Sequence, residues 1–584
     1  MIGASVPASI AITIGAIVSR LAAPSSGDLL TILLAPLAAL GCVVYAGHLA
    51  DAAARPLEFQ ARARIDGAHR AQILAMTTAV PFIAPLERPE VQQLIRQAAA
   101  EPDYGVTTPA DGALAQLRWL AGLTGVVTIC AVLAQFAWWL IPVLVVPAAI
   151  GLCLRSRQYS AAVRALGVAA KEELHADVWR RAAASSAEGK DVRIFGLGDW
   201  MVERMQDHIL AGNSPFWTSV VGIARRSWIQ FALAVAGLLP AYVLVTVAAG
   251  HGTTPAELQT AVLVSGWAVF SSIGSSDIVY RMAGSVGVLR ARADLGTSLG
   301  QRRGTDARPA VVPPQVRGSL PHIRLTGVRF AYPGGSPVLD RLDLEIRPGE
   351  LLAVVGLNGA GKSTLIKLLA GLYQPDGGQI TAGGCPIDSA GWAAWRRRIA
   401  IVFQDFVHYE FSVADNVLLG DASAPADRQA ASRSAAEAGL DEVLRQLPSG
   451  WDTPLSRARR GGVDLSGGQW QQVVLARALY AVRLGAQLLV LDEPTAHLDV
   501  RSESEVFDRL ARRRGNASIV LISHRLSTVR QADRIVLLDG GRITESGSHD
   551  ELMATGGTYA AMFDLQARRF ADGDARATGA DTAP

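Results

Sequence analysis

The longest stretch of the chain without a charged residue runs from Trp119 to Leu154, and it limits the possible folds more than any other feature. A membrane-spanning helix needs about 20 consecutive apolar residues, whereas a soluble core helix does not require so long a run. The stretch predicts two spans, at residues 119–135 and 138–154, joined near Phe136 to Trp139. The tryptophans of this turn suit a membrane interface.

Further apolar stretches reach or approach the length of a span. They cover residues 2–20, 29–50, 227–250 and 256–278. A secretory signal peptide is the alternative for the first stretch, but the charged segment that precedes the apolar run of such peptides is missing. Roughly six spans are expected by the length criterion, so residues 1–299 are predicted to form an all-α six-helix transmembrane domain.

Arginines are concentrated in two long segments between the predicted spans, residues 51–118 and 155–226. The short connections near Ser25 and His251 carry almost no positive charge. Because cytoplasmic segments of membrane proteins carry the excess of Lys and Arg, we expect the two long segments to be cytoplasmic. The same bias accounts for the formal net charge of +3 better than nucleic-acid binding does, and no nucleic-acid partner is expected.

A glycine-rich segment joins an apolar run, Leu351 to Val355, to a second one that begins at Leu365. It consists of Gly356, Leu357, Asn358, Gly359, Ala360, Gly361, Lys362, Ser363 and Thr364. Glycines allow several backbone N–H groups to point at a phosphate, the start of a helix adds its positive dipole, and Lys362 adds a full charge. The Ser363 hydroxyl suits Mg²⁺. The segment predicts a P-loop between a strand and a helix, and this context argues against a chance match.

Two carboxylates, Asp492 and Glu493, end the apolar run that begins at Leu488. Such a run predicts a buried parallel strand that delivers the acids to the sheet edge beside the P-loop. Asp492 suits the coordination shell of magnesium, and Glu493 suits a water molecule that attacks the γ-phosphate. An isolated acidic pair after a strand would be a solvated strand end, but the P-loop favours the catalytic interpretation.

A third segment, Leu465, Ser466, Gly467, Gly468 and Gln469, precedes a helical pattern from Trp470 to Leu479 and is another potential anion site. One bound ATP needs only one phosphate cradle. At this point the chain resembles the ATP-binding cassette (ABC) family, whose signature motif is this pentapeptide and lies between the P-loop and the acidic strand end. The resemblance covers residues 321–566 and implies an α/β P-loop NTPase domain with the ABC-type helical subdomain.

The resemblance assigns roles to further residues. It implies that Tyr332 stacks on adenine, that Gln404 reaches magnesium and senses the membrane domain, and that His524 contacts the γ-phosphate. The D-loop of the family matches Ala496 to Asp499. One departure is visible, because the family often carries a glutamate shortly before the signature where this chain has Arg457, Arg459 and Arg460, and we expect these arginines to form a solvated loop face.

The order of the two domains resembles an exporter-type ABC half-transporter. Family members sandwich ATP between the P-loop of one nucleotide domain and the signature of another, which implies a homodimer or a heterodimer with a second half-transporter, with ATP and Mg²⁺ bound. The cytoplasmic coupling regions are expected near Leu86 to Val91 and Glu188 to Gly196. The expected location is the bacterial inner membrane, crossed several times, with the nucleotide domain in the cytoplasm.

The expected activity is ATP hydrolysis coupled to export of a hydrophobic or amphipathic small molecule, peptide or lipid. An importer built on the same fold, with a siderophore-like substrate, is the alternative within transport. A soluble ABC ATPase acting on DNA or ribosomes shares the nucleotide motifs, but the uncharged spans argue against it. Asp277 follows the last apolar stretch and either faces the transport cavity, favouring cationic cargo, or lies in water at the inner interface.

The remaining segments carry less information. Residues 300–320 are rich in Arg, Gly and Pro and are expected to be a linker, and residues 567–584 are expected to be a disordered tail. The cysteines Cys42, Cys130, Cys153 and Cys385 are scattered, so the sequence indicates neither a disulfide framework nor a cysteine metal site.

Overall fold

The computed structural model of the chain describes residues 2–22, 29–100, 107–184, 189–251, 255–273, 276–300, 320–387, 391–494, 517–523 and 525–565. The chain divides into two compact units. The helical unit comprises residues 1–78 and 88–302, and the sheet unit comprises residues 79–87 and 303–584. Most of the predicted linker, the predicted tail, the D-loop and His524 lie outside the described residues.

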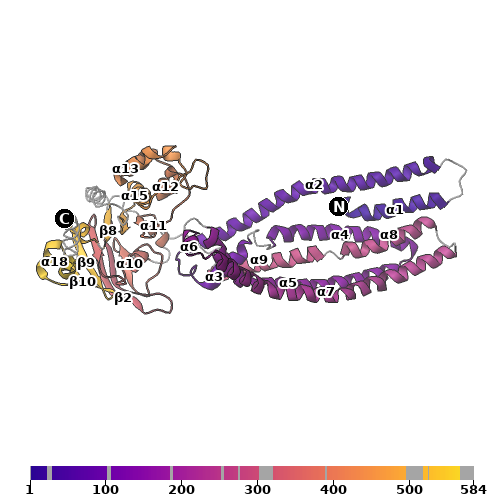
Figure 1. Cartoon of the computed structure of the whole chain (residues 1–584), viewed down its shortest axis with the longest axis horizontal. Coiled ribbons are helices and arrows are strands. Elements are labelled where there is room, and N and C mark those ends of the chain that lie inside the picture. Colours follow the sequence, from indigo (N-terminus) through magenta and orange to yellow (C-terminus); the bar gives the residue numbers. More distant parts are fainter. Residues whose placement is uncertain are drawn as a thin grey trace, which may run out of the picture. The chain divides into compact units, whose positions relative to one another are not determined.

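The described part of the helical unit is built from helices alone. They are α1 (Ile2–Ala22), α2 (Leu29–Thr78), α3 (Pro89–Ala99), α4 (Pro109–Phe136), α5 (Leu140–Ala184), α6 (Gly189–Ile194), α7 (Gly198–Gly250), α8 (Ala256–Ile273) and α9 (Ser276–Ser298). Within this unit, α5 and α7 run side by side, and α1 lies next to α2 (Figure 1).

Several of these helices are much longer than a bilayer is thick. Helix α7 has 53 residues, which at about 1.5 Å per residue exceeds a hydrocarbon core of about 30 Å more than twofold. Among the described residues, four helical segments are long and apolar enough to cross a membrane: Leu33–Thr78, Pro109–Phe136, Leu140–Ala161 and Gly198–Gly250. Shorter apolar segments are Ala8–Leu21 and Leu258–Phe270. The excess length of α2, α5 and α7 contributes much of the Arg-rich segments that the sequence predicts to be cytoplasmic.

The apolar core of the helical unit lies where α4, α5, α7 and α8 meet. Its fully buried members include Ile129, Leu133, Leu144, Ala241 and Val269. Large apolar side chains such as Val127, Trp228 and Phe231 are instead exposed on the outside. An apolar exterior around an apolar core is what a lipid environment requires.

A charged group, which we call the Asp111 cluster, ties three helices of this unit together. The buried carboxylate of Asp111 on α4 accepts bonds from Arg62 of α2 at 2.8 Å and Arg281 of α9 at 2.9 Å. Arg281 also holds Asp277 at 2.9 Å. Asp111 completes a capping box with Thr108 at the start of α4. The cation that pairs with Asp277 is therefore Arg281 of the same chain. The side chain of Asp277 is exposed.

The sheet unit contains two sheets. The first is four-stranded in the order β2-β1-β4-β5, and the second is six-stranded in the order β10-β9-β3-β8-β7-β6. The strands are β1 (Ile323–Ala331), β2 (Pro337–Ile346), β3 (Leu351–Val355), β4 (Gly377–Ala382), β5 (Cys385–Pro386), β6 (Ile399–Val402), β7 (Leu488–Asp492), β8 (Ser518–Ile522), β9 (Arg534–Asp539) and β10 (Arg542–Gly547).

Strands β3, β6, β7, β8 and β9 of the six-stranded sheet pair in parallel. Strands β3, β7 and β8 are buried along their whole length, which explains why they read as continuous apolar runs rather than alternating ones. Strand β8 lies between β3 and β7. The acidic strand end is therefore two strands away from the P-loop, about 10 Å across the sheet.

Helices of the sheet unit cover the two sheets and form a separate helical subdomain. They are α10 (Lys362–Leu369), α11 (Trp392–Arg396), α12 (Val413–Leu418), α13 (Arg428–Ala438), α14 (Asp441–Gln446), α15 (Gly467–Arg483), α17 (Leu526–Val529) and α18 (His549–Thr555). Helix α15 joins the subdomain to the sheet, because it packs against both α13 and β6. Figure 1 shows α15 beside α13.

Residues 79–87 differ from the predicted domain boundaries. The sequence places them in the first domain, but in the structure they group with the sheet unit. Ile83 donates its N–H to the carbonyl of Leu372, and Phe82 meets the edge of Trp392 at 6.2 Å between ring centroids. The segment that groups with the sheet unit therefore overlaps the predicted coupling region, Leu86 to Val91, only at Leu86 and Glu87.

Candidate nucleotide-binding site

Several of the predicted site residues follow the carboxyl ends of parallel strands of the six-stranded sheet. The P-loop follows β3, Glu493 follows β7 and Gln404 comes two residues after β6. The carboxyl ends of parallel strands lie at one edge of a sheet, which is where ligands of open α/β folds bind. The order of the strands therefore gathers groups that are up to 137 residues apart in the chain, from Gly356 to Glu493.

The P-loop has the backbone that a phosphate cradle requires. Gly361, immediately before α10, has φ of +105°, and a Cβ there would lie 2.9 Å from Leu339. A larger residue would have both strain and a clash. Lys362 reaches back across the loop, and its Nζ donates to the carbonyls of Gly356 at 2.7 Å and Leu357 at 3.0 Å. Burial lowers the pKa of Lys362, and Glu493 and Asp492 oppose this shift.

The negative charge of the buried Asp492 carboxylate is only partly balanced by its surroundings. Only 6% of the residue is exposed. Burial and the neighbouring charge of Glu493 raise its pKa to about 6, and Lys362 offsets only part of this rise. A buried carboxylate in this condition binds a cation favourably, because the cation supplies the missing positive charge. Oxygen ligands are available from Asp492, Ser363 and Gln404, so the donor set fits Mg²⁺, which prefers oxygen.

Glu493 has an unusual backbone conformation. Its φ is +47°, in the left-handed region that non-glycine residues rarely adopt. Its N–H donates to the carbonyl of Ile522 at 2.9 Å, and its carbonyl accepts a bond from the Gln471 amide at 3.2 Å. The Gln404 amide donates to the Glu493 carboxylate at 3.3 Å. The structure thus brings two predicted site residues, Gln404 and Glu493, into direct contact.

The predicted signature segment is the start of helix α15. Ser466 caps this helix by accepting the N–H of Gln469, and the Gln469 side chain accepts the N–H of Ser466. This capping box leaves Gly467 and Gly468 in the first turn, where free N–H groups favour an anion. Among the residues that the structure describes, no hydrogen bond or ion pair joins this segment to the P-loop of the same chain.

Tyr332 lies in an aromatic cluster beside the P-loop. Its ring meets Phe330 and Tyr373 edge to face at 5.1 and 5.5 Å between centroids, and Lys367 lies 5.5 Å from its centre. Its hydroxyl is 3.3 Å from that of Thr364 in the P-loop. These contacts hold the ring next to the predicted phosphate cradle, and its stacking on adenine stays a prediction.

Two contacts of this region were not predicted. The Tyr373 hydroxyl donates to the carboxylate of Glu87 at 2.6 and 2.7 Å, and burial followed by this contact raises the pKa of Tyr373. Gln471 reaches the backbone of Glu493. Sequence alone offered one signal, a polar residue at a buried position of the helix for Gln471, and none for the Glu87 contact.

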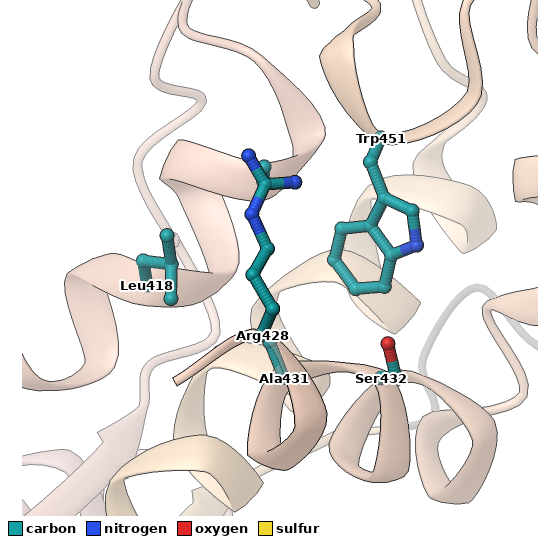
Figure 2. Close-up of a pocket in the computed structure, with 6 residues that line it drawn as sticks. Leu418, Arg428, Ala431, Ser432 and Trp451 are labelled. Carbon is teal, nitrogen blue, oxygen red and sulfur yellow. The ribbon is translucent and has the colours of Figure 1, made fainter. Parts of the chain in front are cut away.

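A small cavity of about 90 Å³ lies elsewhere in the sheet unit, in the helical subdomain (Figure 2). It is lined by Ala414, Leu418, Arg428, Ala431, Ser432 and Trp451. None of the predicted site residues lines it, and its volume holds only a few water molecules. The loop arginines Arg457, Arg459 and Arg460 are exposed, as expected for a solvated face.

Comparison with known proteins defines the class. The family described as ABC transporter matches residues 339–496, which include the P-loop, the signature segment and the acidic strand end. Among curated relatives, an ATP-dependent lipid A-core flippase of Chromohalobacter salexigens is 39% identical over 256 residues, 44% of this chain and 42% of the relative. The mycobactin import ATP-binding/permease protein IrtB of Mycolicibacterium smegmatis is 38% identical over 276 residues, 47% of this chain and 45% of the relative.

The whole chain resembles a solved structure. A bacterial Atm1-family ABC exporter with ATP bound superposes with a TM-score of 0.76, covering 96% of this chain and 97% of that one at 22% identity. The predicted fold is thereby confirmed: an N-terminal helical domain precedes an ABC nucleotide-binding domain.

The chain has the exporter-type ABC fold, and its residues 339–496 match the ABC transporter family. Its apolar helices make it a multi-pass membrane protein. The curated relatives are matched over less than half of their length, 42% and 45% for the two described.

Proposed function

We propose that the chain is one half of an ATP-driven transporter that exports a hydrophobic or amphipathic substrate across the bacterial inner membrane. The observation that carries this proposal is the gathering of the P-loop, Gln404, Asp492 and Glu493 at one sheet edge, in a chain that also contains helices apolar enough to cross a membrane. The match to lipid A-core flippases favours a lipid-like substrate among the possibilities.

In this proposal the P-loop binds the phosphates of ATP, and Lys362 turns from the loop carbonyls to the β- and γ-phosphates. Bound Mg²⁺, held by Ser363, Asp492 and Gln404, would neutralise charge on the phosphates. Glu493 orients the attacking water and accepts its proton, while Tyr332 stacks on adenine. His524, in the role that the family resemblance gives it, contacts the γ-phosphate.

The contacts of residues 79–87 support coupling between nucleotide chemistry and transport. This segment directly follows the long helix α2 and is fixed to the sheet unit through Ile83 and Glu87. Its anchor Tyr373 is also in edge contact with Tyr332. Movement of the nucleotide domain on ATP binding would therefore be transmitted to α2.

A dimer completes the site in this proposal. Within the described part of the chain, the signature segment makes no hydrogen bond or ion pair with its own P-loop, so in this proposal a second chain supplies the signature for each ATP. Helix α6 leaves Ile194 and the adjacent Phe195 exposed, 76% and 71%, which provides apolar surface for a second chain. Both a homodimer and a heterodimer satisfy these requirements.

The test is ATP hydrolysis by the purified full-length chain in lipid nanodiscs, with Glu493→Gln as the control. Hydrolysis that is lost in the variant supports a competent homodimer with the proposed carboxylate. Absence of hydrolysis, followed by recovery on adding a second half-transporter from the same cell, would identify a heterodimer. Hydrolysis that persists in Glu493→Gln would refute the role of the carboxylate.

Import is the second candidate, and the match to a mycobactin import protein is the observation that favours it. Direction can be measured with inverted membrane vesicles, whose cytoplasmic face points outward. Accumulation of a fluorescent lipid or a hydrophobic dye inside such vesicles on addition of ATP supports export. ATP-dependent release of preloaded compound supports import.

A further inference from the structure

The most unusual backbone geometry of the predicted site is at Glu493. Its φ of +47° is disfavoured for any residue with a Cβ, and Pro494 follows it. A residue before proline prefers an extended conformation, so the chain is doubly biased against the one it adopts here. Such strain persists only where surrounding contacts determine it, and it concentrates at functional sites.

The backbone of Glu493 is hydrogen-bonded on each side of its Cα. On the amino side, the N–H of Glu493 donates to Ile522 of β8 and extends the parallel ladder that pairs Asp492 with Ile522. On the carboxyl side, the carbonyl has left the ladder, and the Gln471 side chain donates to it at 3.2 Å. With both flanking peptides fixed, the direction of the Glu493 side chain is fixed as well.

The buried position of Gln471 indicates that its polar side chain has a specific role. It lies on the buried face of α15, only 3% exposed, among Trp470, Val473 and Val474. An apolar residue would be expected there if packing alone mattered, since burying an amide costs free energy unless it is hydrogen-bonded. Ser466, the cap of the same helix, belongs to the signature segment five residues earlier.

We infer that Gln471 is a positioning residue for hydrolysis, which holds Glu493 in its left-handed conformation and connects it to the helix that begins at the signature segment. The inference rests on the proposed function, because it assumes that Glu493 activates water. Gln471 acts through the backbone of Glu493, so it contributes to the rate of the chemical step rather than to the affinity for ATP.

The experiment measures kcat and KM for ATP in full-length protein in nanodiscs, for the wild type and three variants. Gln471→Met and Gln471→Glu retain the size of the side chain but remove the amide donor. Gln472→Met is the matched control, because Gln472 is the next residue of the same helix and is only half-buried. Thermal unfolding is recorded for each protein, to compare the folded state of the variants.

Both Gln471 variants are expected to lower kcat about tenfold with little change in KM, the size expected for loss of one positioning hydrogen bond. Gln472→Met should remain within about twofold of the wild type. Equal kcat in Gln471→Met, Gln471→Glu and the control would overturn the inference. The inference would also be overturned if kcat and thermal stability fell equally in the Gln471 variants and in Gln472→Met. Wild-type hydrolysis that persists unchanged in Glu493→Gln would instead overturn the role of Glu493 in the proposed function.

Discussion

Each unit of the molecule contains a buried aspartate, and the two are treated in opposite ways. Asp111 of the helical unit is 7% exposed and Asp492 of the sheet unit is 6% exposed. Asp111 receives two arginines, Arg62 and Arg281, and caps a helix as well. The charge of Lys362 lowers the pKa of Asp492, whereas burial and the neighbouring carboxylate of Glu493 raise it.

The difference in partners distinguishes a carboxylate with a structural role, Asp111, from a carboxylate suited to binding a cation, Asp492. A buried carboxylate that is saturated with partners stabilises the packing of the elements that supply them, here α2, α4 and α9. A buried carboxylate left with a raised pKa is poised to take up a cation from outside the chain. Burial alone, which is nearly equal at the two sites, does not distinguish these roles.

Removal of Mg²⁺ should give the largest effect and separates the two sites directly. With excess EDTA, hydrolysis of ATP should fall below detection, since the phosphates and Asp492 lose their shared cation. The thermal stability of nucleotide-free protein should be unchanged, because the Asp111 cluster contains its own cations. Retained hydrolysis in EDTA would contradict the assignment of Asp492 as a metal ligand.

Asp492→Asn should give the second-largest effect. It should lower the rate of hydrolysis about 100-fold or more, because the amide is a poor ligand for Mg²⁺. The midpoint of thermal unfolding should remain the same or rise, since a poorly compensated buried charge is removed. The control is Asp464→Asn, an exposed aspartate of the same unit. A large loss of thermal stability in Asp492→Asn would show that Asp492, like Asp111, has a structural role.

Asp111→Asn should show the opposite pattern. It should lower the free energy of unfolding of the helical unit by about 2 kcal/mol, because Arg62 and Arg281 then lack their shared carboxylate. This value lies below the usual range for a broken buried pair, since the two arginines are 39% and 32% exposed. The rate of basal hydrolysis should change by less than about twofold. Denaturant unfolding in detergent, followed by intrinsic tryptophan fluorescence, measures the first quantity.

Glu87 is intermediate between Asp111 and Asp492, because its carboxylate has a partner but that partner is the neutral hydroxyl of Tyr373. Loss of this contact should give the smallest of the expected effects. Tyr373→Phe should increase the hydrogen-exchange rate of residues 79–87 about threefold, the size expected for one lost hydrogen bond. Tyr409→Phe is the control, because Tyr409 is another tyrosine of the same unit and is exposed. Equal exchange in the two variants would show that Phe82 and Ile83 alone hold the segment.

Much of the architecture could be predicted from local patterns. The uncharged run Trp119 to Leu154 is continuous in the sequence, and so are the P-loop and the run that ends at Asp492, so each predicts its own element. The strand order could not be predicted in this way. Strand β8 lies between β3 and β7 because sheet order depends on how distant strands pack, which no single segment encodes.

The sequence by itself determined the class of fold and the chemical groups of the nucleotide site, because span length, glycine spacing and strand-end carboxylates are properties of short contiguous segments. The assignment of individual site residues to ATP and Mg²⁺ stays a prediction. Only the tertiary structure decided which polar groups meet, as in Gln471 with Glu493, Glu87 with Tyr373, and Asp111 with its arginines. These partners are far apart in the chain, and their contacts exist only once helices and strands have packed.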